Sequence, residues 1–149
     1  MKSALLFVIL LFISPDSTGL DEIRTNYNKA VSDKALCEKM ITELSKTQNE
    51  STDYLAYLGG FQAIWANHVF SPVSKLSTFN KGKKNIERAI KKEPDNAEYR
   101  FIRLSIQKNV PSILGYKSNI KEDTEFLKSN QNQIKSQILQ KNIEALLKN

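Results

Sequence analysis

The segment GKKNIERAIKKEPDNAEYRFIR, residues 82–103, has the pattern of one helix that ends and a second that begins. Ile86 and Ile90 are four residues apart, which places them on one helix face. Pro94 cannot continue that helix, because it lacks a backbone N–H and biases the preceding residue away from helical angles. Asp95 stands three residues before a glutamate, which is the spacing of a capping box. The segment therefore predicts two antiparallel helices joined by a short proline turn.

The preceding apolar segment is expected to form a helix that packs against this helix pair. It is TDYLAYLGGFQAIWANHVF, residues 52–70, and it carries Gly59 and Gly60 in its middle. A glycine inside a helix costs about 1 kcal/mol relative to alanine, and close approach of two helix backbones is a usual reason to keep one. We therefore predict that Gly59 or Gly60 faces the helix that contains Gly82.

The rest of the chain repeats the same helical periodicity. Amphipathic segments cover residues 20–31, 33–46, 72–92, 119–127 and 131–149. A strand-like alternation of apolar and polar residues does not recur in the sequence. We predict an all-α fold of about six or seven helices, arranged either as stacked antiparallel hairpins or as a compact bundle.

One apolar segment interrupts the helical pattern. It is NVPSILGY, residues 109–116, in which Pro111 and Gly115 break the periodicity. Its apolar residues, among them Ile113 and Tyr116, are too many for a free loop. The segment either folds back on the core or forms an exposed contact patch.

Part of this pattern resembles a tetratricopeptide repeat. Seven residues keep the spacing of that family's two helices: Leu55, Leu58, Gly59, Gly82, Ile86, Ala89 and Pro94. Gln62 departs from the family, which usually has an aromatic residue there. The interval from Gly59 to Gly82 is also about eleven residues longer than in a standard repeat. The resemblance covers residues 51–103 and implies helical hairpins that bind a protein or peptide.

The N-terminus predicts export. Lys2 precedes an apolar run, residues 4–13, and small residues follow up to Gly19, which is the layout of a secretory signal. We predict cleavage after Gly19, with no transmembrane segment in the chain that remains. The alternatives are an uncleaved anchor and an apolar helix packed into the core. Residues 96–116 also resemble a family of small exported bacterial helical proteins without known activity, which implies a periplasmic or secreted protein.

The composition limits the partners and the size of the fold. Residues 20–149 are expected to form one domain with a single core. The hydrophobic fraction of 40% and the charged fraction of 26% are those of a folded globular chain. The net charge of +6 favours acidic partners such as an anionic surface or an acidic protein. The favoured alternative is a solvated lysine-rich surface, because lysines and glutamates are mixed along the chain, and no nucleic-acid partner is expected.

Sequence motifs for catalysis or cofactor binding are not found. His68 and Cys37 are the single histidine and the single cysteine, which are too few for a metal site or a histidine-based nucleophile. No glycine-rich loop of the phosphate-binding kind is present, because the pair Gly59-Gly60 lies inside an apolar helical segment. We therefore expect no cofactor and no enzyme, and a small hydrolase that uses carboxylates alone remains the alternative. Cys37 is expected to be buried, with a disulfide between two molecules as the other interpretation.

Arg100 and Arg103 are the candidate binding residues. They are three apart on one helix face, where two guanidinium groups can receive a carboxylate or phosphate. The tetratricopeptide-like resemblance implies that they line a concave groove for a peptide terminus, and Tyr116 is the third candidate residue of that groove. The competing interpretation is a structural ion pair with one of three glutamates: Glu87, Glu93 and Glu98. The first functional hypothesis is an exported interaction module for a protein or peptide, and the second is a basic protein that binds an anionic envelope surface. Nothing in the sequence specifies the oligomeric state.

Overall fold

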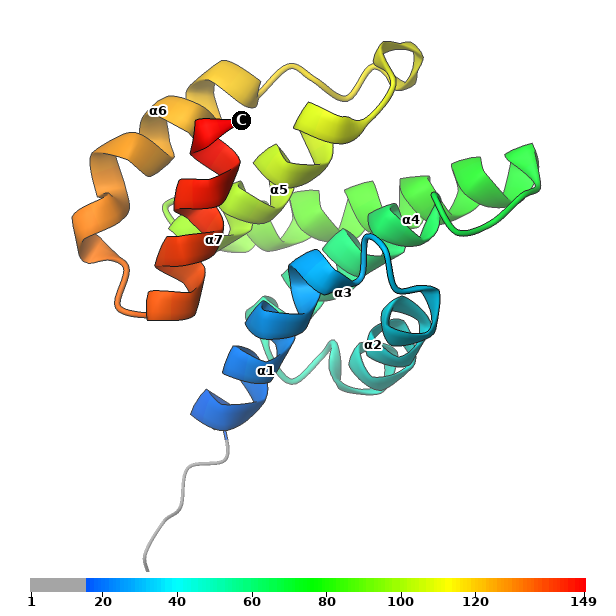
Figure 1. Cartoon of the computed structure of the whole chain (residues 1–149), viewed down its shortest axis with the longest axis horizontal. Coiled ribbons are helices and arrows are strands. Elements are labelled where there is room, and N and C mark those ends of the chain that lie inside the picture. The colour runs from blue at the N-terminus through cyan, green and yellow to red at the C-terminus, as the bar shows by residue number, and fades with distance from the viewer. Residues whose placement is uncertain (1–15) are drawn as a thin grey trace, which may run out of the picture.

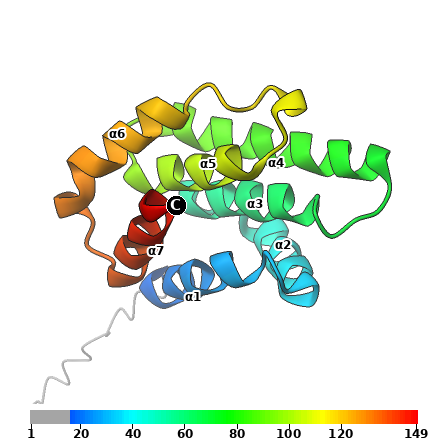
Figure 2. The same ribbon diagram turned by 45° about the horizontal axis from the view of Figure 1, so that its top comes forward.

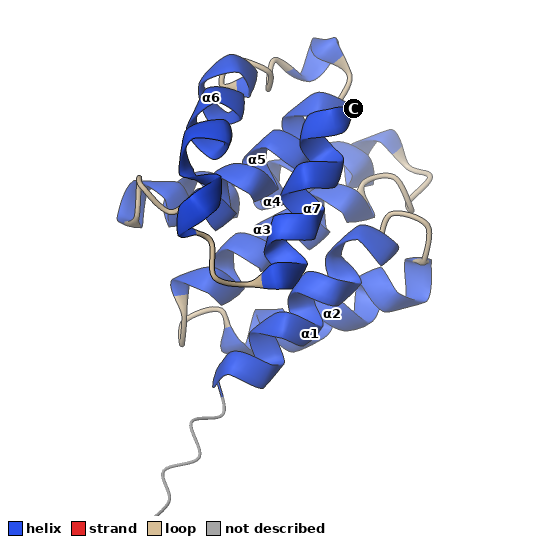
Figure 3. Cartoon of the chain, turned by 60° about the vertical axis from the view of Figure 1, so that its left-hand side comes forward, coloured by secondary structure: helices blue, strands red, loops and turns tan. Residues whose placement is uncertain are grey.

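The computed structural model describes residues 16–149, which fold into seven α-helices and two short 3₁₀ turns (Figure 1). In chain order they are α1 (Asp16–Lys29), α2 (Lys34–Thr47), α3 (Thr52–Trp65), α4 (Pro72–Lys92), α5 (Ala97–Asn109), η1 (Ser112–Leu114), α6 (Ile120–Asn130), η2 (Gln131–Gln133) and α7 (Gln137–Lys148). Within these residues no strand is present, and helices pack against helices throughout (Figure 3). The all-α prediction, with six or seven helices, is confirmed.

The predicted secretory signal falls mostly outside this part of the chain. Residues 1–15 are not among those described, so the structure does not test the signal or the alternatives to it. The expected cleavage point after Gly19 lies inside α1. Among the described helices, none is both long and apolar enough to cross a membrane.

Helix α3 forms the centre of the fold. It contacts α1, α2, α4 and α5, and it lies between them in Figure 2. Every residue from Leu55 to Phe61 is buried, because the segment is apolar on all its faces and each face meets another helix. The charged and amphipathic helices therefore arrange themselves around α3 and leave their polar sides to solvent.

Glycines bring the backbones of α3 and α4 together. A Cβ atom built on Gly59 would lie 2.7 Å from the carbonyl oxygen of Gly82. A Cβ atom built on Gly82 would lie 2.5 Å from the carbonyl oxygen of Gly59 and 2.6 Å from the backbone nitrogen of Ala63. This is the contact that the glycine pattern predicts. Gly60 allows α1 and α5 to pack closely on α3, because its lack of a side chain makes room for Tyr27 of α1 and Ile102 of α5.

The proline turn joins α4 to α5 as expected, but its capping residue differs from the prediction. Helix α4 ends at Lys92, with Glu93 as its C-cap directly before Pro94, and the N-cap of α5 is Asn96 rather than Asp95. The Asn96 side chain accepts a hydrogen bond from the backbone N–H of Glu98 at 3.0 Å. The Glu98 side chain does not return to the cap, because it pairs with an arginine of α1 instead.

Candidate functional site

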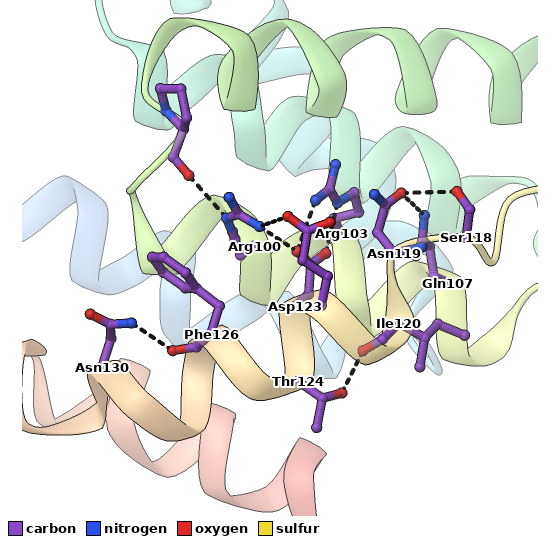
Figure 4. Close-up of polar contacts among 12 residues, drawn as sticks. Arg100, Arg103, Gln107, Ser118, Asn119, Ile120, Asp123, Thr124, Phe126 and Asn130 are labelled. Carbon is purple, nitrogen blue, oxygen red and sulfur yellow. Dashed lines mark hydrogen bonds and ion pairs between the residues drawn. The ribbon is translucent and has the colours of Figure 1, made fainter.

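The predicted binding residue Arg103 lies in a buried ion pair. Its guanidinium group, on α5, donates two hydrogen bonds to Asp123 of α6, at 2.7 and 2.8 Å (Figure 4). It also donates to Glu87 of α4 at 3.2 Å. Burial disfavours the charged guanidinium, but the hydrogen bonds and charge of Asp123 outweigh it and raise the pKa of Arg103. Asp123 itself is fully buried.

Arg100 joins the same cluster from one turn earlier on α5. It donates to Asp123 at 3.1 Å and to the exposed carboxylate of Glu122 at 2.7 Å. Its Nε atom donates to the carbonyl oxygen of Pro94 at 2.9 Å, and its guanidinium carbon lies 4.5 Å from the ring centroid of Phe126. Four separate contacts therefore hold this side chain in place.

Tyr116 meets the cluster through Glu87. Its hydroxyl donates to that carboxylate at 2.7 Å, and its ring packs edge-on against Phe79 of α4 with centroids 5.9 Å apart. The structure thus brings the three predicted residues together, but their polar groups already have partners. Of the glutamates proposed as ion-pair partners for the arginines, Glu87 is used and Glu93 and Glu98 are not. Together these contacts tie α4, α5 and α6 to one another.

A second charged network links α1, α3 and α5, and no local sequence pattern predicts it. Glu98 accepts hydrogen bonds from Nε and Nη2 of Arg24, both at 2.7 Å, and from the hydroxyl of Tyr57 at 2.6 Å. The hydrogen bond and charge of Glu98 raise the pKa of Arg24 despite partial burial. Arg24 and Glu98 are 74 positions apart in the chain, so no local sequence pattern could have paired them.

A cleft of about 340 Å³ opens beside this network. It lies between Arg24, the start of α5 and the connection from α6 to α7. Its walls include two carboxylates, Asp95 and Glu98, which is the minimum that a carboxylate-only hydrolase needs. Both oxygens of Glu98 already accept hydrogen bonds, and Asp95 is exposed on the turn. A second cleft of about 240 Å³, between α1, α2 and the start of α3, is lined by exposed glutamates.

The exposed apolar side chains gather at one end of the molecule. We call this the loop end and define it as residues 30–34, 66–77 and 110–117, which are the α1–α2 turn, the α3–α4 loop with the first turns of α4, and the η1 segment (Figures 1 and 2). It contains all the large hydrophobic residues that are exposed in the described chain: Val31, Phe70, Val73, Leu76 and Ile113. Phe70 and Ile113 are 94% and 93% exposed, so they project almost completely into solvent.

One contact joins two parts of the loop end, and the third part is anchored on α4. The imidazole Nε2 of His68 lies 2.8 Å from the carbonyl oxygen of Ala30, which joins the α3–α4 loop to the α1–α2 turn. Tyr116 packs on α4 just beyond η1. The single histidine therefore has a structural contact. Residues 109–116 were expected either to fold back on the core or to be exposed. The segment does both, because Tyr116 is buried against the core while Ile113 is exposed.

The loop end is also poor in acidic residues. The chain has no aspartate or glutamate in residues 54–86 or 99–121, and these two stretches carry four and five basic residues. The one acidic residue of the loop end, Asp33, caps α2 by accepting the backbone N–H of Leu36 at 2.9 Å. Glu93 and Asp95 lie at the opposite end of the α3–α4 hairpin. The mixing of lysine and glutamate along the chain therefore does not describe this surface.

Cys37 is buried in the core, as predicted. Its side chain has no exposed area, and Sγ donates a weak hydrogen bond to the carbonyl oxygen of Phe61 at 3.4 Å. Burial, together with the nearby negative charge of Asp33, raises the pKa of the thiol to about 12. The thiol therefore stays protonated at neutral pH, where it is a poor nucleophile.

We expect the native chain to react very slowly with a disulfide reagent at pH 8. The thiolate is the reactive form, and the raised pKa together with the absence of exposure withholds it until the fold opens. Absorbance of the released thiol, followed with and without denaturant, measures this. Complete reaction in denaturant is the control, and equally fast reaction of the native chain would contradict the buried position.

Comparison with protein-family models, with curated proteins and with solved structures finds no match to this chain.

Proposed function

We propose that the chain is an exported helical interaction module that acts by binding and meets its partner with the loop end. The observation that carries this proposal is the collection of every large exposed hydrophobic side chain in the described residues at that one end. Single exposed hydrophobic residues are ordinary on a protein surface, but a group of them at one end of a molecule marks an interaction site.

The loop end replaces the arginine groove as the proposed contact surface. The guanidinium groups of Arg100 and Arg103 are held by carboxylates of neighbouring helices, and the hydroxyl of Tyr116 is held by Glu87. A ligand at these residues would have to break buried ion pairs. By contrast, the side chains of Phe70 and Ile113 need no rearrangement to make a contact.

Two further parts of the proposal come from the sequence. Export follows from the signal-like residues 1–19, and the tetratricopeptide-like hairpin from the spacing of residues 51–103. The antiparallel pair α3 and α4, followed by the contacting pair α5 and α6, is consistent with stacked hairpins. Such hairpins present their connecting loops at one end of a stack, which is where the exposed apolar residues lie.

Hydrolysis by carboxylates is the second candidate function, favoured only by the presence of Asp95 and Glu98 in the larger cleft. A general acid must be within hydrogen-bond reach of the group that it protonates. Both oxygens of Glu98 instead accept hydrogen bonds from Arg24, and one of them also accepts from the Tyr57 hydroxyl, so this carboxylate is already engaged inside the protein. We therefore place binding ahead of hydrolysis.

Site-specific photo-crosslinking tests the proposed contact surface. A photoreactive amino acid is introduced at Phe70 or Ile113 and, as controls, at Ser129 of α6 or Lys141 of α7, which are also exposed. In cells that produce the protein we expect adducts from the two loop-end positions, whether with lipid or protein, and none from the controls. Adducts confined to the control positions would refute the proposed surface.

A further inference from the structure

We infer that the partner of the loop end is an anionic lipid bilayer surface, on which Phe70 and Ile113 insert while nearby lysines contact the headgroups. This inference rests on the proposed function, since it assumes that the loop end is the contact surface. It adds the chemical class of the partner. Three features of the described residues support it: the exposure of the apolar residues, the anchoring of the segments that carry them, and the local charge.

The shape of the loop end suits a fluid surface better than a preformed protein pocket. Phe70 and Ile113 are almost fully exposed and lie on different connections, beside Pro72 and Pro111. They project outward and do not line a groove, and the two clefts described above lie elsewhere. Projecting apolar side chains can enter the boundary between headgroups and acyl chains, where no matching cavity is required.

The projecting residues rest on well-anchored segments. The η1 segment is held by Tyr116 on one side, and beyond it Asn119 exchanges two hydrogen bonds with the buried Gln107, at 3.1 and 3.2 Å. On the other connection, Lys75 donates to the carbonyl oxygen of Ala66 at 3.2 Å. Because these segments are already ordered, docking costs little conformational entropy.

The charge of the loop end matches an anionic surface. Lys34, Lys75 and Lys117 are exposed within it, and the stretches that carry two of them contain no acidic residue. Each lysine near an anionic bilayer strengthens binding by roughly fivefold. The far end of the α3–α4 hairpin carries both signs, with Lys91 and Lys92 beside Glu93 and Asp95. The protein is therefore expected to dock through the loop end, where basic residues outnumber acidic ones.

The charge also separates this partner from a second copy of the chain. Two loop ends in contact would bring lysines against lysines, which opposes self-association. An acidic protein would satisfy the charge but would need pockets for Phe70 and Ile113. A bilayer needs no preformed pocket, because apolar side chains can enter it wherever they meet its surface. Apolar insertion combined with basic residues gives reversible, salt-dependent docking.

Vesicle binding tests the inference with matched variants of the full chain, so that all of them share the same N-terminus. Vesicles of phosphatidylcholine alone are compared with vesicles that also contain phosphatidylglycerol, and bound protein is measured by sedimentation. We expect Phe70→Ser to weaken binding to the anionic vesicles by about tenfold. Moving the aromatic residue in Phe70→Ser/Ser129→Phe keeps the composition and is expected not to restore binding.

Charge reversal supplies the second comparison. Lys75→Glu/Lys117→Glu is expected to weaken binding by roughly tenfold or more. Lys128→Glu/Lys141→Glu has the same net charge but changes exposed residues of α6 and α7, and it is expected to bind like the unchanged chain. Equal weakening by the two pairs would overturn the inference, because it would mean attraction without a defined docking end. Unchanged thermal unfolding of each variant shows that the fold is retained.

A local probe completes the test. The fluorescence that Phe70→Trp adds is expected to be quenched by brominated anionic lipid, whereas the fluorescence that Ser129→Trp adds is not, each compared with the unchanged chain, which already contains Trp65. Absence of this quenching, with photo-crosslinks from Phe70 to an acidic protein, would overturn the lipid inference and leave the proposed contact surface standing. Absence of any contact at Phe70 or Ile113 would remove both.

Discussion

Replacement of Asp123 by alanine is expected to destabilise the folded state by about 3–5 kcal/mol. Asp123 is fully buried. It accepts hydrogen bonds from Nε and Nη2 of Arg103 and one hydrogen bond from Arg100. Its removal leaves Arg103 buried with only the longer contact to Glu87. An uncompensated buried charge costs far more than the pair contributes. Urea unfolding followed by the helical circular dichroism signal measures the change in the free energy of unfolding.

Two variants control for this effect. Glu122→Ala removes an exposed partner of Arg100 from the neighbouring position, and it is expected to cost less than about 1 kcal/mol. Arg103→Met/Asp123→Leu removes both charges and is expected to be much less destabilising than Asp123→Ala alone. A small effect of Asp123→Ala, similar to that of Glu122→Ala, would show that the cluster does not hold α5 to α6.

Gly82→Ala is expected to destabilise the fold by about 2 kcal/mol, because the clash with backbone atoms puts its cost at the upper end of the overpacking range. The new Cβ atom would lie 2.5 Å from the carbonyl oxygen of Gly59 and 2.6 Å from the backbone nitrogen of Ala63, so α3 and α4 must move apart. Backbone atoms cannot rotate away as a side chain can, and overpacking of this kind costs about 1–3 kcal/mol or more. The gain in helix propensity, about 1 kcal/mol, offsets only part of the cost. The shift in the urea midpoint measures the result.

Gly115→Ala is the matched control. Gly115 has a φ of +62°, but nothing lies within 4 Å of its added Cβ atom, so this variant tests backbone strain without a clash. It is expected to cost about 1 kcal/mol. If Gly82→Ala were as stable as the unchanged chain, the close approach of α3 and α4 would not be required for the fold.

Much of the fold could be read from local pattern. The apolar periodicity identified the helices, Pro94 marked the end of α4, and Gly59 with Gly82 indicated which helices approach closely. These features succeed because they depend on residues a few positions apart, where helix geometry fixes which side chains share a face. The cap of α5 was misplaced by one residue, since Asp95 and Asn96 are both good capping residues and only the length of the turn selects between them.

The candidate site was less accessible to this reasoning. Arg100 and Arg103 are correctly placed on one face, but their main partner, Asp123, lies on the next helix. Arg24 and Glu98 are 74 residues apart, and only the packing of α1 against α5 brings them together. Burial separates a structural arginine from one that can bind a ligand, and burial is a property of all the surrounding helices.

By itself, the sequence determined the helices, the glycine contact between two of them and the basic character of the chain, because each follows from local spacing or composition. Only the tertiary structure decided which charges are neutralised inside the protein and which apolar residues remain exposed. Phe70 and Ile113 are 43 positions apart along the chain, and the antiparallel packing of the helices places their loops at the same end. A surface of this kind forms only when distant segments fold together.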